Sequence, residues 1–315
     1  MSSVFIKNNM AAGDILMLTS AVRDLKKSHP EIHIGVGTSF MDLWYNNPNI
    51  DRRVTEDTAT QVVYADYPLY KQNNVLPYHF IHGFRKQLED ALQLPIEQGP
   101  FKVDLYLTEE EKDREWVNIV LGTDKPYWII NASSKKDFTI KQWDVSRYQE
   151  VINRTKGKIL WVQTGYSKDS SSDLYDVIDL RGLTSIRQMC QLMYYASGVL
   201  TPVSFPMHLA TMDTPVPNTK RPCVVVAGGR EPSQWEAYTT HKFLHNCGCY
   251  PCNREGGCWM SRVYKLNDNT RHDNLLCKMP TTTETGFQIA QCMKDITVDM
   301  VVEAINSYLQ YPVIY

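Results

Sequence analysis

The sequence predicts an α/β protein made of two successive units, each with a parallel sheet and helices on its faces. Strand-like and helix-like segments alternate from residue 3 onward, and the same alternation restarts after Pro126. The chain has 315 residues, of which 43% are hydrophobic, so it can form roughly two cores of ordinary domain size. We therefore divide it into residues 1–124 and 125–315.

In the first unit, a strand at residues 3–8 leads into a helix that begins near Gly13. Apolar residues from Ile15 to Leu25 recur at helical spacing, and Pro30 must end this helix. Further strands and amphipathic helices follow, at residues 31–38, 60–66, 78–96 and 108–122. A strand–helix–strand order at the very start of the chain favours a parallel sheet.

The second unit repeats this order and ends on a helix. Its predicted strands are residues 127–133, 157–165, 177–182, 198–204 and 221–229. Its predicted helices are residues 143–156, 184–197 and 297–310. Ligands of paired α/β units usually bind in the crevice between the two halves, so we expect the functional site there.

The charge balance argues against a general nucleic-acid or membrane surface. The 33 basic and 35 acidic residues leave a formal charge of −2, so only a local basic groove stays open. No apolar stretch approaches the roughly 20 residues of a membrane span. The N-terminus lacks the charged and apolar regions of a secretory signal. We expect a cytoplasmic protein without a membrane span.

Most of the eight cysteines gather near the C-terminus, in the segment 245–292. In a reducing compartment clustered cysteines are more often metal ligands than disulfides, although a disulfide stays open. Thiolates at such spacings can converge on a zinc or iron ion. The predicted ligands are Cys252, Cys258, Cys277 and Cys292. Cys247 or Cys249 could replace Cys252. Four protein ligands leave no open position for chemistry, so we expect a structural metal in an insertion of the second unit.

Three ordered motifs resemble a known family. They are GDILMLTSAVRDLKKSHPEIHIGVGTS from residue 13, KQWDVSRYQEVI from residue 141 and DLRGLTSIRQMCQLMYYASGVLTPVSFPMHLATM from residue 179. In this order, and over most of the chain, they resemble the heptosyltransferases of glycosyltransferase family 9. The resemblance implies a GT-B fold, in which two Rossmann-like domains face each other across a cleft.

The same resemblance implies an inverting glycosyltransferase that needs no Mg²⁺ and moves a sugar from a nucleotide sugar to an acceptor hydroxyl. The donor, typically ADP-heptose, is held mainly by the second domain, and the acceptor lies on the first. The cysteine-rich segment resembles a branch that includes autotransporter heptosyltransferases, where a cysteine set holds an iron. The acceptor stays open among a saccharide, a protein and a modified nucleobase, and a homo-oligomer stays open too.

The resemblance also assigns roles to individual residues. Asp14, at the start of the first helix, is the expected catalytic base, although a plain helix cap is a common use of such an aspartate. Lys141 is the expected catalytic cation that neutralises the leaving diphosphate, and a solvated loop lysine is the alternative. His208 equally suits a histidine of the core. The expected donor-binding residues are Gly13, Ser133, Ser134, Gln163, Ser204, Met207, His208 and Arg230.

Two departures from the family pattern leave other functions open. Val203 and Phe205 stand where the family has an acidic residue and a glycine, which puts the donor in doubt and allows a non-catalytic relative. A zinc-containing nucleic-acid-binding protein, or a transferase acting on modified DNA bases, is the alternative. The basic residues that favour it are Arg254, Arg262, Lys265 and Arg271. His79, His82 and Arg85 share one helical face and suit either acceptor contact or a plain surface helix.

Overall fold

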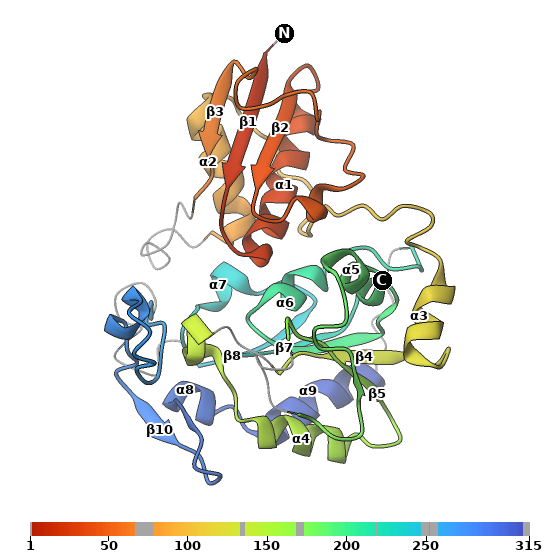
Figure 1. Ribbon diagram of the computed structural model, residues 1–315, viewed down its shortest axis with the longest axis vertical. Helices are drawn as coiled ribbons and strands as arrows, with labels where there is room; N and C mark the ends of the chain where they lie inside the picture. The colour runs from red at the N-terminus through yellow and green to blue at the C-terminus, as the bar shows by residue number, and fades with distance from the viewer. Residues whose placement is uncertain are drawn as a thin grey trace.

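The structure is a computed structural model that describes residues 2–66, 78–132, 136–167, 173–217, 219–246, 252 and 258–310. A small sheet with its helices stands on top of a larger α/β unit in Figure 1. Ser133 and Ser134, two of the predicted donor-binding residues, lie outside the described residues. The same is true of Cys247 and Cys249.

The small sheet is parallel and has three strands in the order β2-β1-β3. Its strands are β1 (Ser3–Asn8), β2 (His33–Thr38) and β3 (Gln61–Tyr64). The helices α1 (Ala12–Ser28) and α2 (Phe80–Leu92) contact each other along this sheet. A short 3₁₀ helix, η1 (Met41–Trp44), follows β2. Alternate residues of β1 are buried, as expected for a strand with one covered face.

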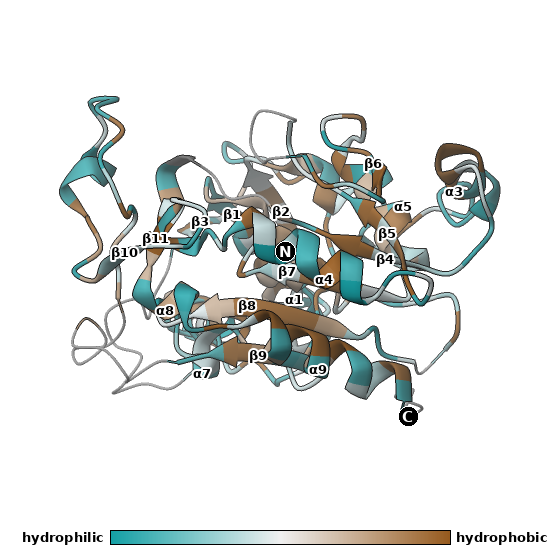
Figure 2. Ribbon diagram, turned by 90° about the horizontal axis from the view of Figure 1, so that it is seen from below, coloured by the Kyte–Doolittle hydropathy of each residue, from teal (hydrophilic) through white to brown (hydrophobic). Residues whose placement is uncertain are grey.

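The large sheet has six parallel strands in the order β6-β5-β4-β7-β8-β9. The strands are β4 (Tyr127–Ile130), β5 (Leu160–Gln163), β6 (Ile178–Asp179), β7 (Gly198–Pro202), β8 (Cys223–Gly228) and β9 (His241–His245). Counted from β4, this is the doubly wound order 3-2-1-4-5-6, which reverses between β4 and β7. Every residue of β8 is buried, and Figure 2 shows this strand as a hydrophobic stretch.

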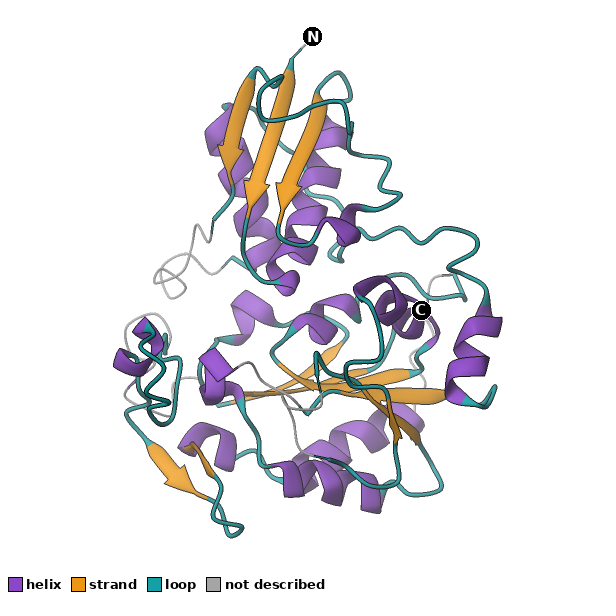
Figure 3. Cartoon of the chain, viewed as in Figure 1, coloured by secondary structure: helices purple, strands orange, loops and turns teal. Residues whose placement is uncertain are grey.

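Helices cover both faces of the large sheet, as Figure 3 shows. The face toward the small sheet carries α5 (Ile186–Tyr195), α6 (Phe205–Leu209) and α7 (Ser233–Glu236). The opposite face carries α4 (Val145–Arg154), α8 (Gln291–Lys294) and α9 (Val298–Gln310). Two covered faces explain why β4, β7 and β8 read as continuous apolar runs.

The predicted helix 108–122 is shorter than expected. It is α3 (Arg114–Leu121), and Asp113 caps it by accepting a hydrogen bond from the Glu115 N–H at 2.9 Å. The residues before Asp113 form a turn instead of a helix. α3 contacts α5 of the large unit, and the domain boundary after residue 124 stays a prediction.

The C-terminal part of the chain adds irregular structure beside the large sheet. Its regular elements are η5 (Arg271–Asn274) and the antiparallel pair β10 (Pro280–Thr282) and β11 (Gln288–Ala290). The 3₁₀ segment η2 (Lys136–Lys141), which follows β4, contacts β11. The fully buried guanidinium of Arg262 binds Asp268 at 2.6 Å and Asp273 at 2.5 Å. Arg262 therefore cannot contribute to the basic surface that the nucleic-acid alternative requires.

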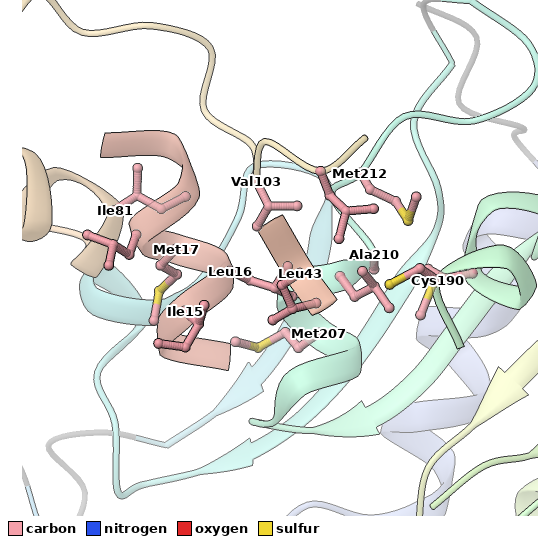
Figure 4. Close-up of a cluster of buried hydrophobic side chains, with 14 of the residues drawn as sticks. Ile15, Leu16, Met17, Leu43, Ile81, Val103, Cys190, Met207, Ala210 and Met212 are labelled. Atoms are coloured by element: carbon pink, nitrogen blue, oxygen red, sulfur yellow. The ribbon is translucent and has the colours of Figure 1, made fainter. Parts of the chain in front are cut away.

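One hydrophobic core joins the two sheets through α1 and α6. Ile15 and Leu16 of α1 pack in the same buried cluster as Met207 of α6 and Ala210 beside it, as Figure 4 shows. Burial of each large apolar side chain stabilises the folded state by roughly 1.5–3 kcal/mol. The N-terminal end of α1 is therefore held firmly against the large unit.

Polar contacts reinforce this junction. Arg187 of α5 pairs with Glu111 and donates to the carbonyl oxygens of Asp42 and Tyr106. Lys102 contributes a second ion pair, with Asp213.

Among the described residues, no helix is long and apolar enough to cross a membrane.

Candidate active site

Several of the predicted catalytic and donor-binding residues lie where the strand order of the large sheet reverses. β4 leads toward η2, which ends at Lys141, and β7 leads through Val203 and Ser204 into α6. The carboxyl ends of parallel strands at such a reversal form the usual ligand crevice of doubly wound sheets. The start of α1 contacts α6 at this place, so residues from both units come together here.

Asp14 is the third residue of α1, and Ala11 is the N-cap. The Asp14 carboxylate accepts a hydrogen bond from the Ala11 N–H at 3.0 Å. The positive end of the helix dipole stabilises an anion at this position. With 7% of its surface exposed, Asp14 lies at the junction of the two units rather than on an outer surface. Asp14 is therefore not the N-cap residue of α1, as the alternative reading expected. Its carboxylate instead binds the N–H group of the N-cap residue, Ala11.

Gly13 lies directly against His208. A Cβ atom at Gly13 would be 2.9 Å from His208 Cδ2, which is closer than carbon atoms normally approach. His208 is buried, with Nδ1 at 2.9 Å from the Tyr238 hydroxyl and Nε2 at 3.4 Å from Glu236 Oε2. Burial, followed by the charges of His79 and Lys141, lowers the pKa of His208 well below its usual value. The ring is therefore neutral and serves as a packing partner of α1.

Lys141 and Arg230 both pair with Glu231. Lys141 Nζ lies 3.0 Å from Glu231 Oε1 and 3.3 Å from the Val203 carbonyl oxygen. Arg230 pairs with the same carboxylate through Nη1. Burial alone would raise the pKa of Glu231, but Lys141 and Arg230 offset it and lower the pKa. Glu231 is therefore ionised between its two partners.

A second buried acid, Glu236, links the two predicted catalytic residues. Burial, followed by the negative charges of Glu231 and Asp14, raises the pKa of Glu236 well above its usual value, while Lys141 lowers it. Gly13, next to Asp14, packs against His208, whose Nε2 lies 3.4 Å from Glu236 Oε2. The charges of Asp14 and Lys141, which belong to different units, both act on this carboxyl group. The sequence analysis missed Glu231 and Glu236, although both stand in the segment GREPSQWEAY among buried aromatic residues.

Other predicted donor-binding residues have structural partners. Ser204 precedes α6, and its hydroxyl lies 2.9 Å from Thr201 Oγ1. Met207 is completely buried in the core between the units. Gln163 is also completely buried, and its Oε1 accepts a hydrogen bond from Leu174 N at 3.3 Å. Met207 and Gln163 are therefore completely buried packing residues and expose no surface to a donor.

The helical face with three basic residues is not a plain surface. His79 caps α2 by accepting from Ile81 N at 3.2 Å, and it is buried. Arg85 pairs with Glu89 at 2.9 Å within the same helix. The His82 ring stacks on Phe101 at 5.3 Å. These side chains hold α2 in place. Their spacing is therefore explained without a role in acceptor binding.

The four predicted metal ligands line one small cavity of about 10 Å³, which is the room of about one water-sized atom. Cys277 Sγ accepts a hydrogen bond from Met279 N at 3.3 Å. Burial raises the pKa of Cys258 to about 12 and that of Cys292 to about 11. Within the described ranges, no three histidine, cysteine, aspartate or glutamate side chains are already arranged around a common metal position.

Gly228 makes the approach to this cavity possible. Its φ is +64°, a conformation that other residues rarely adopt, and a Cβ there would lie 2.5 Å from Met293 Sδ and 3.4 Å from Cys292 Sγ. Beyond it, Arg230 lines the cavity, and its carbonyl oxygen accepts from Cys258 N at 3.1 Å. The loop after β8 thus connects the thiol cavity with the Lys141–Glu231 pair.

Comparisons with known proteins identify the family and the fold. Residues 65–256 match the family model described as glycosyltransferase family 9 (heptosyltransferase). No curated protein matches the chain. A glycosyl transferase family 9 structure from Veillonella parvula is 13% identical and has a TM-score of 0.67, with 98% of this chain and 97% of that one covered.

Two further solved structures are similar. The iron-containing dodecameric glycosyltransferase TibC from enterotoxigenic E. coli is 18% identical over 98% of this chain and 78% of that one, with a TM-score of 0.65. TibC has also been solved with ADP-D-β-D-heptose. The E. coli ADP-heptose LPS heptosyltransferase II is 16% identical over 98% and 99% of the two chains, with a TM-score of 0.61. These structures confirm the predicted α/β fold with parallel sheets, as in GT-B heptosyltransferases.

Proposed function

Because the chain belongs to glycosyltransferase family 9, we propose that it transfers heptose or a related sugar from an ADP-linked donor to an acceptor hydroxyl, with inversion. The geometry around α6 carries this proposal, because Gly13 of α1 packs against His208 of α6, and Lys141 Nζ lies 3.3 Å from the carbonyl oxygen of Val203, just before α6. It brings a base from the first unit and a cation from the second to one place. The complex of TibC with ADP-D-β-D-heptose supports the choice of donor.

The residues divide the reaction between the two units. Asp14 removes the proton of the acceptor hydroxyl, whose oxygen attacks the anomeric carbon. The bond from that carbon to the diphosphate oxygen breaks, and Lys141 and Arg230 stabilise the negative charge that develops there. Two cations do this work without Mg²⁺, as charge-assisted hydrogen bonds to phosphate are strong. Ser204 supplies a hydroxyl at the same strand end.

We further propose that Cys252, Cys258, Cys277 and Cys292 hold a structural zinc or iron ion. Their common cavity and the N–H group directed at Cys277 Sγ fit a thiolate site, and the similar TibC contains iron. Bound metal would cross-link the segment after β9 to α8, which holds Cys292, without taking part in transfer. A cytoplasmic location and a homo-oligomer stay predictions, the latter supported by the dodecameric TibC.

Donor binding provides the test of the proposed function. Ligands that bind only the folded state raise the melting temperature by mass action. We expect ADP and ADP-sugars to raise it and UDP-sugars to leave it unchanged. Lys141→Ala should abolish the ADP shift, whereas Lys156→Ala, which removes an exposed lysine paired with Asp176, should retain it. A wild-type protein that no adenine nucleotide stabilises would contradict the proposal.

A further inference from the structure

The cations of the proposed phosphate site share a single carboxylate. We call Lys141, Glu231 and Arg230 the charge triad. Lys141 Nζ lies 3.0 Å from Glu231 Oε1, and Arg230 pairs with the same oxygen. The side chains of Arg230 and Glu231 are 8% and 5% exposed. Two positive charges and one negative charge leave the charge triad with one net positive charge.

Arg230 is held in place from several sides. Its Nε donates to the Met260 carbonyl oxygen at 3.0 Å. Its guanidinium carbon lies 5.2 Å from the Phe138 ring centroid and 5.3 Å from that of Trp259, which are distances of cation–π contact. Because Glu231 follows Arg230 directly in the chain and is buried beside it, its carboxylate stays next to whatever the two cations bind.

Sugar transfer changes the charge that this site must hold. The acceptor oxygen bonds to the anomeric carbon, the carbon–oxygen bond to the diphosphate breaks with its electron pair, and the hydroxyl proton moves to Asp14. A nucleotide sugar carries two negative charges on its diphosphate. The leaving nucleoside diphosphate carries a further charge on its terminal phosphate, since the second ionisation of a phosphate monoester lies near pH 6.

We propose that Glu231 is a specificity-determining residue whose fixed carboxylate weakens the binding of the leaving nucleoside diphosphate relative to the nucleotide sugar. This inference rests on the proposed function. The extra negative charge of the product meets the carboxylate of Glu231 in a buried setting, where like charges repel strongly. Product release is faster as a result, and the enzyme is less inhibited by its own product.

Calorimetry at pH 8 gives the dissociation constants of ADP and of ADP-ribose, a probe in which both ends of the diphosphate are esterified. The ratio of the two constants tests the proposal. In Glu231→Gln, ADP binding should strengthen relative to ADP-ribose by about tenfold, because the repulsive charge is gone. Glu231→Asp keeps the charge and should keep the wild-type ratio. Glu89→Gln removes the glutamate of another arginine–glutamate pair, in α2, and should also leave the ratio unchanged.

Loss of a buried partner can prevent folding, so a second pair of variants carries the same comparison. Arg230→Gln and the double variant Arg230→Gln/Glu231→Gln differ only in the Glu231 charge, and the double variant should prefer ADP more strongly, again by about tenfold. A wild-type protein that binds neither nucleotide overturns the proposed function and this inference together. A wild type that binds both, with equal ratios in all variants, overturns the inference alone.

Discussion

Asp14, the proposed base, also has a role in local structure. Its carboxylate accepts from the Ala11 N–H at 3.0 Å, and its helix is pressed against His208 through the neighbouring Gly13. Both contacts fix where the carboxylate lies relative to Lys141 and Glu236. A base so held needs little reorganisation before it accepts a proton.

Asp14→Asn separates the two tasks. The asparagine oxygen can accept the same hydrogen bond from the Ala11 N–H, so the melting temperature and ADP affinity should stay close to those of the wild type. Turnover should fall at least about 100-fold, since general base catalysis typically contributes that much. Asp113→Asn, at the cap of α3, is the matched control and should keep its turnover. Undiminished turnover in Asp14→Asn would exclude Asp14 as the base.

At the scale of elements, the start of α2 depends on a buried neutral histidine. His79 accepts from Ile81 N, and its ring meets those of Phe101 and Tyr238 at 4.8 and 4.7 Å. Burial lowers the pKa of His79 to about 3. The unfolded chain binds a proton at this histidine below about pH 6.5 and the folded chain does not. Its effect on stability is therefore absent above that pH and becomes unfavourable as the pH falls toward 3.

We expect His79→Asn to make the protein less sensitive to acid. Asparagine is a good N-cap, so α2 should still form, with some loss of ring packing at pH 8. Between pH 6.5 and pH 5 the wild type should lose about 2 kcal/mol of unfolding free energy that the variant does not lose. Urea unfolding at pH 8, 6.5 and 5 measures this difference. Parallel losses in both proteins would show that another group dominates the acid response.

At the scale of the whole molecule, two units of different size share one hydrophobic core. The core around α1 and α6 is continuous, and the thiol cavity is lined in part by Arg230, in the loop after β8 that also carries Glu231. A second hydrophobic cluster covers the other face of the large sheet and includes Cys258, Met293 and Ile305. Order in the cysteine-rich segment should therefore affect the stability of the second unit as a whole.

Cys277→Ala/Cys292→Ala should lose the bound zinc or iron and melt at a lower temperature, because metal binding by four thiolates contributes to folding. Metal analysis and thermal unfolding measure both effects. Cys190→Ala/Cys223→Ala is the matched control, since these two cysteines are buried in the other hydrophobic cluster. The control should lose some stability through its cavities but keep its metal. Equal metal content in both double variants would refute this ligand set.

The sequence by itself determined the order of elements and the parallel sheets. Alternating strand and helix periodicity is a local property, so β1, α1, α4, α5 and α9 lie where the patterns predicted them, within a few residues. Element ends were less certain, because a single cap such as Asp113 decides where α3 begins. β9 was missed, since HKFLH lacks a long apolar run.

Only the tertiary structure decided which side chains meet. Asp14 and Glu236 are far apart in the chain, and they come near each other because Gly13 packs against His208 of α6, which in turn lies 3.4 Å from Glu236 of α7. The pairing of Glu231 with two cations could not be read from its motif, because the charge of a buried acid depends on partners that the fold supplies. The complete burial of Met207 and Gln163 could not be predicted either, because it also depends on how distant elements pack. Local patterns specify elements, while burial and charge at a site arise only when distant elements pack together.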